Sequence, residues 1–349
     1  MKINDLEFYL VAVGQTESAA PIRSLLVRMT TDSGLEGWGE SGLAWRVGEL
    51  AARRDALLAV LAGRSIYDIE ELHTLESLSP PPLRSAIVMA VYDLLGRALR
   101  QPLCNLLGGY YRRRVPVSVR LPARRANPTA QVSRELAEQG LHTQTLASSG
   151  RPDEDVATIL AIREVVGDRI ALRLDGQGHY DLETARDVCA GLEFQGLQFF
   201  IDPLNTRELH PLASLARQTS IPLAAWRAIR GPADALAAVR CGAAPFLVVD
   251  LEQVGGIVPA RACAAIAAAA GVVPLLGGRP SLGIATAAML HLAAAIPAFA
   301  TANDVTPGQL RDTVLVDRLE ITDGMMAVPE ARGLGVEVDR TKVERYQVA

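Results

Sequence analysis

Short apolar segments alternate with amphipathic ones through most of this sequence, and this alternation constrains the fold more than any other feature. The stretches between the apolar segments, such as 154–166, 182–192 and 232–241, show helical spacing and are long enough for a parallel return. Eight such β/α units in succession predict a TIM-type barrel, whose active site lies at the carboxyl ends of its strands. The eight segments expected to form strands are residues 116–121, 143–147, 170–175, 197–201, 221–225, 246–250, 272–276 and 298–302.

The N-terminal third has a different pattern. Residues 1–40 read as strand, turn and strand, with the turn at Asp32-Ser33-Gly34. Residues 48–108 change to helical spacing. We therefore predict an α+β capping domain over residues 1–114 and a barrel domain over 115–319, with a C-terminal tail (320–349) that returns to the cap.

Composition narrows the classes of function. The net charge of −4 over 349 residues provides no positive field for nucleic acid or anionic lipid, so a small-molecule partner is expected. The N-terminus lacks the apolar run of a signal peptide. The apolar runs 262–276 and 282–302 are interrupted by Pro274 and Pro297, so no membrane segment is expected. The four scattered cysteines read as reduced thiols of a cytoplasmic protein.

Several motifs occur in a specific order: GWGE at 37–40, AVYDLLGRALRQPLCNLLGG at 90–109, VPVSVRL at 115–121, EDVATILAIREVVGDRIALRLDGQG at 154–178, VGGI at 254–257, LGIATAAMLHLAAA at 282–295 and GLGVEVDRTKVERY at 333–346. Together they resemble the mandelate racemase and muconate lactonizing enzyme branch of the enolase superfamily. The resemblance covers almost the whole chain. It implies an α/β fold, a (β/α)7β-type or (β/α)8 barrel with an N-terminal α+β cap, and a homo-oligomer.

The resemblance also implies a chemistry. In the family a substrate carboxylate binds magnesium held by three acids, one at the end of each of strands three, four and five, and a base removes the neighbouring proton. The bases are a lysine pair on strand two, or a lysine or an acid with a histidine partner on strands six and seven. In this sequence Thr145 and Ala147 stand where the lysine pair belongs. Neither side chain acts as a base near neutral pH.

The metal-ligand positions also depart from the family pattern. Asp175 matches the first ligand, whereas Ile201 stands at the second, with Asp202 displaced by one residue to the opposite face of the strand. Trp226-Arg227 replaces the acidic pair on strand five. One carboxylate holds magnesium poorly, because this cation requires several oxygen ligands. We therefore predict that no magnesium binds in the family position and that the protein uses no cofactor.

Two interpretations of the remaining charged residues stay open. Asp250 keeps the position of the strand-six acid, and Arg279 lies in a strand-seven region without histidine. In the first interpretation, Arg227 and Arg279 bind an anionic substrate, while Asp250, with Asp175, moves the proton. In the second, Asp175 pairs with Arg227 and Asp250 pairs with another arginine as internal salt bridges.

Further side chains also have two interpretations each. Trp226 either stacks on the substrate or plugs the vacated metal pocket. His179, just beyond strand three, either donates a proton or is an ordinary surface residue. Asp202 is expected to cap the loop that follows it, and Glu252 and Gln253 are expected to be solvated.

The leading prediction is a divergent isomerase or lyase, similar to a racemase, cycloisomerase or dehydratase, that removes a proton next to the carboxylate of a small acid without a metal. One alternative is a non-catalytic descendant that binds a carboxylate or serves as an oligomer subunit. Another is a magnesium enzyme with a shifted site formed by Asp175, Asp202 and a loop acid.

Overall fold

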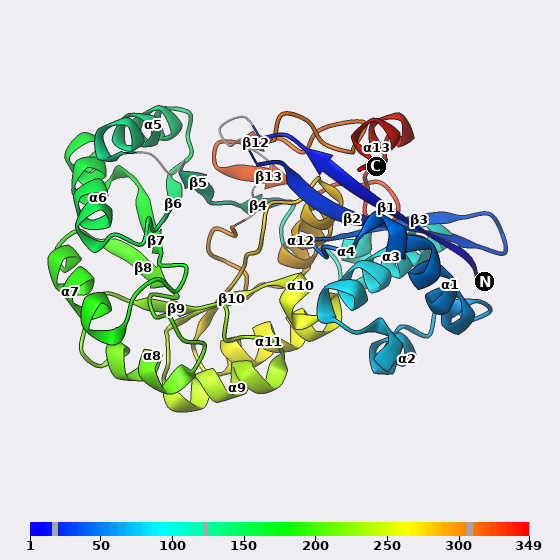
Figure 1. Ribbon diagram of the computed structural model, residues 1–349, viewed down its shortest axis with the longest axis horizontal. Helices are drawn as coiled ribbons and strands as arrows, with labels where there is room; N and C mark the ends of the chain where they lie inside the picture. Colours follow the sequence, from blue (N-terminus) through cyan, green and yellow to red (C-terminus); the bar gives the residue numbers. More distant parts are fainter. Residues whose placement is uncertain (16–19, 122–124, 305–309, 349) are drawn as a thin grey trace.

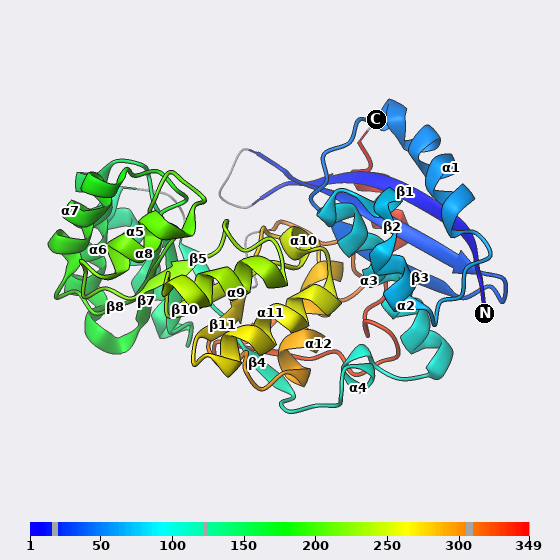
Figure 2. The same cartoon turned by 90° about the horizontal axis from the view of Figure 1, so that it is seen from below.

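The computed structural model describes residues 1–15, 20–121, 125–304 and 310–348. The N-terminal cap, blue and cyan in Figure 1, lies beside the barrel, which is green to orange, and both chain ends lie on the side of the cap. In the view turned by 90° the cap again lies beside the barrel, with α3 next to α10 (Figure 2). This arrangement confirms the predicted fold class, an α/β barrel with an N-terminal capping domain.

The cap is a three-stranded antiparallel sheet that packs on a long helix. The strand order is β1-β2-β3, and α3 lies against β3. A Cβ atom added at Gly37 would lie 2.4 Å from the carbonyl oxygen of Ala90, and one at Gly39 would lie 1.9 Å from that of Ala86. Only glycine allows β3 to approach α3 this closely, which explains the two glycines of the GWGE motif. The strands of the cap are β1 (Ile3–Val13), β2 (Ile22–Thr31) and β3 (Glu36–Ser41).

The barrel is built around seven parallel strands in the order β11-β10-β9-β8-β7-β6-β5. They alternate with helices, as the sequence pattern predicts, and the strands β8 to β11 enclose a small apolar cluster. The strands are β5 (Val119–Leu121), β6 (Thr143–Ala147), β7 (Ala171–Asp175), β8 (Leu197–Ile201), β9 (Leu223–Ala225), β10 (Phe246–Val249) and β11 (Val273–Leu276).

The predicted eighth strand at 298–302 is wrong, because these residues form a turn and irregular backbone. The next two residues join the two edge strands instead. The amide of Ser118 donates to the Asn303 carbonyl (2.8 Å), and the amide of Asp304 donates to the Leu276 carbonyl (2.8 Å). The predicted first strand is also divided, since Arg114–Pro116 (β4) belongs to a different sheet from β5.

Helices pack against the strands of both parts. The 3-10 helices are Val47–Glu49, Glu76–Leu78 and Gly167–Arg169. The α-helices are α1 (Leu50–Leu61), α2 (Ile69–Thr74), α3 (Pro81–Leu99), α4 (Leu103–Leu106), α5 (Ala126–Glu138), α6 (Pro152–Val166), α7 (Leu182–Leu192), α8 (Leu209–Ala216), α9 (Pro232–Cys241), α10 (Leu251–Val254), α11 (Ile257–Ala269), α12 (Ile284–Ala295) and α13 (Arg340–Tyr346).

The C-terminal segment contacts the cap. β12 (Ile321–Thr322) and β13 (Met325–Ala327) form a small antiparallel sheet with β4. Further on, α13 packs on β1, and the amide of Val348 donates to the Leu10 carbonyl (2.8 Å). Within the described ranges, none of the helices combines the length and the apolar composition needed to cross a bilayer.

Candidate functional site

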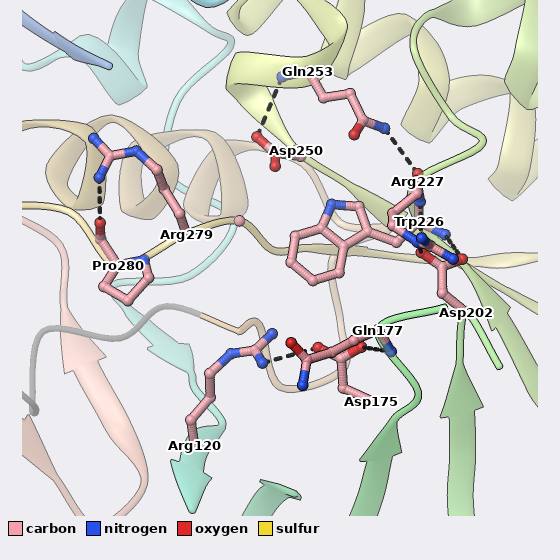
Figure 3. Close-up of a pocket in the computed structure, with 11 residues that line it drawn as sticks. Arg120, Asp175, Gln177, Asp202, Trp226, Arg227, Asp250, Gln253, Arg279 and Pro280 are labelled. Carbon is pink, nitrogen blue, oxygen red and sulfur yellow. Dashed lines mark hydrogen bonds and ion pairs between the residues drawn. The ribbon is translucent and has the colours of Figure 1, made fainter. Parts of the chain in front are cut away.

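A cavity of about 360 Å³ opens at the carboxyl ends of the barrel strands. Figure 3 shows that side chains from several strand ends point into it. Five of the six site residues predicted from the sequence line this cavity, and His179 does not. The lining residues are Arg120, Asp175, Gln177, Asp202, Trp226, Arg227, Asp250, Gln253, Gly278, Arg279 and Pro280.

Arg120, on β5, bridges two acids at the mouth of the barrel. Its Nη1 donates to Asp175 Oδ2 (2.9 Å), and its Nη2 donates to Asp304 Oδ2 (2.8 Å). Burial disfavours the charge of this guanidinium, but the two carboxylates outweigh burial and raise the pKa of Arg120. The predicted pairing of Asp175 with Arg227 is therefore wrong, because Asp175 pairs with Arg120.

The sequence analysis did not single out Arg120. The available signal was an arginine within the apolar strand segment VSVRL, because a buried strand seldom carries a charge without a partner. The identity of that partner could not be predicted, since Asp304 lies 184 positions further along the chain.

Two positions that the resemblance assigns to metal ligands carry large side chains without a carboxylate. Ile201 is 1% exposed and belongs to an apolar cluster inside the barrel, together with Phe199 and Val248. Trp226 packs against this cluster and also faces the cavity. Its indole ring lies 5.7 Å from the Arg120 guanidinium carbon. Trp226 thus fills space between the apolar interior and the arginine.

Asp202 follows β8 and, contrary to expectation, also lines the cavity. The strand ends at Ile201, and Asp202 has a φ of 39°, so the alternation of an extended strand no longer determines its direction. Its carboxylate accepts the backbone amides of Trp226 (3.0 Å) and Arg227 (2.7 Å) and the Arg227 Nε (3.2 Å). Asp202 therefore caps the turn after β9 and not the loop that follows it.

Asp250 stands at the end of β10 and caps the short helix α10. Its Oδ1 accepts the backbone amides of Glu252 (2.9 Å) and Gln253 (3.3 Å). Burial raises the pKa of Asp250, although these two amides, the Trp226 side chain and the charge of Arg279 counteract the shift. Among the described residues no arginine forms an ion pair with Asp250, so the expected salt bridge is not present there.

Arg279 connects the barrel mouth to the cap. Its Nε donates to Glu252 Oε1 (3.0 Å), and its Nη2 donates to Ser24 Oγ on β2 (2.8 Å). The other oxygen of Glu252 accepts the amide of Gly42, in the loop after β3 (2.8 Å). Burial raises the pKa of Glu252 to about 7, against the charge of Arg279. The prediction that Glu252 and Gln253 are solvated is wrong, because Gln253 also donates to the Trp226 and Ile229 carbonyls.

His179 lies outside the cavity, on the exposed loop after β7. Its Nδ1 lies 3.2 Å from Ser148 Oγ. At the strand-two positions, the Thr145 hydroxyl is buried against Ser118 Oγ (2.8 Å), and Ala147 has no polar group. The chain contains two lysines, Lys2 and Lys342, and neither lines the cavity.

The donor set at the barrel mouth does not suit a magnesium ion at the positions that the resemblance indicates. Asp175 engages Arg120 with one oxygen and the backbone amide of Gln177 with the other (3.1 Å). Ile201 and Trp226 offer no oxygen ligand. Throughout the described part of the chain, no group of three or more His, Cys, Asp and Glu side chains is placed to hold a metal ion.

Comparison with known families gives two matches. Residues 128–342 match the family model "Enolase C-terminal domain-like". Residues 11–108 match the model "Mandelate racemase / muconate lactonizing enzyme, N-terminal domain". The first match alone covers more than half of the chain.

Individual proteins are similar over nearly the whole length. Muconate cycloisomerase 1 of Rhodococcus opacus is 29% identical, over 92% of this chain and 90% of its own. The hydrophobic dipeptide epimerase of Enterococcus faecalis is also 29% identical, over 96% of both chains. Among solved structures, an enolase from Streptomyces coelicolor superimposes with a TM-score of 0.90 at 27% identity, covering 99% of this chain and 96% of that one.

Proposed function

The chain belongs to the mandelate racemase and muconate lactonizing enzyme branch of the enolase superfamily, and from this we propose that it is an isomerase or lyase acting on a small carboxylic acid without magnesium. The observation that carries the proposal is the composition of the cavity. Arginines line it together with Asp250, a carboxyl group whose pKa burial raises. Relatives named for muconate and for dipeptides, which all contain a carboxylate, support this class of substrate.

Arg227 and Arg279 are the proposed anion-binding groups. A guanidinium offers a planar pair of N–H donors that matches a carboxylate. Both arginines line the cavity and approach it from different strand ends, β9 and β11. A bound carboxylate is thereby oriented with its neighbouring carbon toward Asp250, which lies between them just after β10.

Asp250 is the proposed proton acceptor. A carboxylate with a raised pKa is a stronger base, and a general base works best when its pKa lies near the operating pH. The amides of Glu252 and Gln253 fix its orientation. Asp175 is a weaker candidate for this step, since Arg120 and the Gln177 amide already engage its two oxygens. We propose that Asp175 supports the site through Arg120.

Isotope exchange tests this proposal. Small acids, including dipeptides, N-succinyl amino acids and muconate, are first screened by their effect on the melting temperature. Acids that bind are then followed by proton NMR in heavy water. We expect loss of the signal of the proton next to the carboxylate, unchanged by EDTA, and a rate at least about 100-fold lower in Asp250→Asn. Asp187→Asn, an exposed acid on α7, is the matched control and should exchange at the wild-type rate.

A second candidate is a non-catalytic carboxylate-binding protein. The pairing of both arginines with acids of the chain itself favours it, since Arg227 contacts Asp202 and Arg279 contacts Glu252. Binding of acids with no exchange in the wild type would establish this alternative. Exchange that EDTA abolishes would instead support a metal enzyme, although no three acids in the described ranges converge on a shifted site.

A further inference from the structure

The charged groups around Arg120 carry an inference that is independent of any catalytic step. We infer that the Arg120 guanidinium is the permanent counter-ion of the barrel mouth, and that it keeps a divalent cation out of a site formed by Asp175 and Asp304. Like the proposed function, this role of Arg120 requires that no magnesium binds at the barrel mouth. Proton exchange of a bound acid tests the proposed function, whereas cation binding tests the role of Arg120.

The geometry places one cation between two carboxylates that solvent barely reaches. The Asp175 and Asp304 side chains are 3% and 4% exposed, and the Arg120 side chain is 15% exposed. Separate nitrogens of the guanidinium contact the two acids, at 2.9 and 2.8 Å. Carboxylates this deeply buried need a positive partner, because the cost of removing two negative charges from water is otherwise uncompensated.

A second observation indicates that the carboxylate site has capacity for a further ligand. Asp304 Oδ1 is buried and has no hydrogen-bond partner among the described residues. Arg173 is fully buried on β7, and burial lowers its pKa to about 10, with the charge of Asp304 acting in the opposite direction. The second oxygen of Asp304 is therefore bonded neither by Arg120 nor by Arg173.

Removal of Arg120 leaves the Asp175 and Asp304 carboxylates without the cation between them, and Asp175 faces the cavity of about 360 Å³. A hard divalent cation binds carboxylate oxygens and completes its shell with water. In the space vacated by Arg120 the two carboxylates supply oxygens, and water supplies the remaining ligands. In the wild type the guanidinium occupies this space and adds a repelling charge. The wild type should therefore bind neither Mg²⁺ nor Mn²⁺ there.

Arg120→Met, which keeps much of the side-chain volume without the charge, tests the inference. Free Mn²⁺ is measured by electron paramagnetic resonance during titration of the purified protein. We expect about one Mn²⁺ per chain in Arg120→Met, bound at least tenfold more tightly than by the wild type, and a melting temperature that rises with Mn²⁺ in this variant alone. Arg120→Met/Asp175→Asn should lose the added binding, and Arg120→Lys, which retains a cation, should not gain it.

Two results would overturn the inference. One is stoichiometric Mn²⁺ binding by the wild type that matches Arg120→Met. The other is a folded Arg120→Met protein, with wild-type circular dichroism, that binds no Mn²⁺. If Arg120→Met does not fold in the absence of metal, refolding with and without Mn²⁺ decides the matter, since the inference requires that Mn²⁺ restore the native spectrum.

Discussion

At the scale of single residues, Asp202 shows how one carboxylate can organise a turn and a charged group together. It accepts two backbone amides and the Arg227 guanidinium while 7% exposed. Asp202→Ala leaves these partly buried donors without their acceptor, so we expect a loss of about 2 kcal/mol in the free energy of unfolding, measured with urea. Asp202→Asn keeps one acceptor oxygen and tolerates the positive φ, so its loss should be smaller, about 1 kcal/mol.

The control for Asp202 is another aspartate with positive φ. Asp323, in the turn between β12 and β13, has a φ of 53° but is exposed, and its carboxylate accepts no buried donor from the described residues. Asp323→Asn should therefore change stability by less than about 0.5 kcal/mol. Equal losses of stability in Asp202→Asn and Asp323→Asn would show that the positive φ determines the loss, and not the hydrogen bonds that the Asp202 carboxylate accepts.

The residue scale also shows what the sequence could reveal. Motif positions placed Asp175, Asp250, Arg227 and Arg279 at one barrel mouth, because parallel strands all end at the same edge. The ion-pair partners of Asp175, Arg227 and Arg279 could not be predicted in this way. Arg227 pairs with Asp202 because the chain turns at a positive φ after β8, which directs the carboxylate toward the arginine. A pattern of residue types predicts neither this turn nor the direction of the carboxylate.

At the scale of elements, the loop after β3 can contact Arg279 only because residue 42 is a glycine. A Cβ atom added at Gly42 would lie 2.0 Å from Arg279 Nε, the same nitrogen that donates to Glu252. Gly42→Ala should displace Arg279 and break the contacts of Glu252 with both Arg279 and the loop amide. We expect a loss of about 1 to 3 kcal/mol in unfolding free energy and weaker binding of any acid that raises the wild-type melting temperature.

Gly48, in the same segment, is the matched control. A Cβ there meets no atom within 4 Å, and its φ is not in the left-handed region. Gly48→Ala should therefore be neutral or stabilise by up to about 1 kcal/mol, because alanine restricts the unfolded chain. Acid binding that is equally weak in both variants would indicate that the loop as a whole, and not Arg279, was responsible.

The strands of the barrel could be predicted from the sequence pattern except for the eighth. The alternation of strands and helices predicted seven of the barrel strands, because buried parallel strands are short continuous apolar runs. Residues 298–302 have the same composition but follow α12 directly in a turn. The position of the eighth strand is instead occupied by Asn303 and Asp304. Their hydrogen bonds to Ser118, just before β5, to β11 and to Arg120 depend on long-range contacts that local composition does not encode.

At the scale of the whole molecule, His291 joins three parts of the chain. It lies on the barrel helix α12, and its Nδ1 accepts the amide of Cys104 in α4 (3.1 Å). Its Nε2 donates to the carbonyl of Leu334 in the C-terminal segment (3.0 Å). The side chain is fully buried, and burial lowers its pKa to about 4, although the Leu334 carbonyl acts in the opposite direction.

This lowered pKa makes the junction sensitive to acid. Well above pH 6.5 the imidazole is neutral in both the folded and the unfolded state, so the stability contributed by His291 does not change with pH there. Between pH 6.5 and about 4 the unfolded chain binds a proton that the native protein does not, so stability falls with pH by up to about 3 kcal/mol. Glu252 acts in the opposite direction, because its raised pKa makes the native state bind the extra proton between pH 4.5 and about 7. The two effects partly cancel in the wild type and must be separated by substitution.

His291→Gln separates them, because glutamine can accept from Cys104 and donate to Leu334 but does not titrate. We expect the variant to lose about 1 kcal/mol at pH 7.5 and to become more stable relative to the wild type as the pH falls to 4, measured by urea unfolding across this range. Glu252→Gln should change the profile in the opposite sense, which separates the two groups. If the unfolding free energies of the wild type and His291→Gln fall in parallel between pH 7.5 and 4, His291 does not make the junction of cap, barrel and C-terminal segment sensitive to acid.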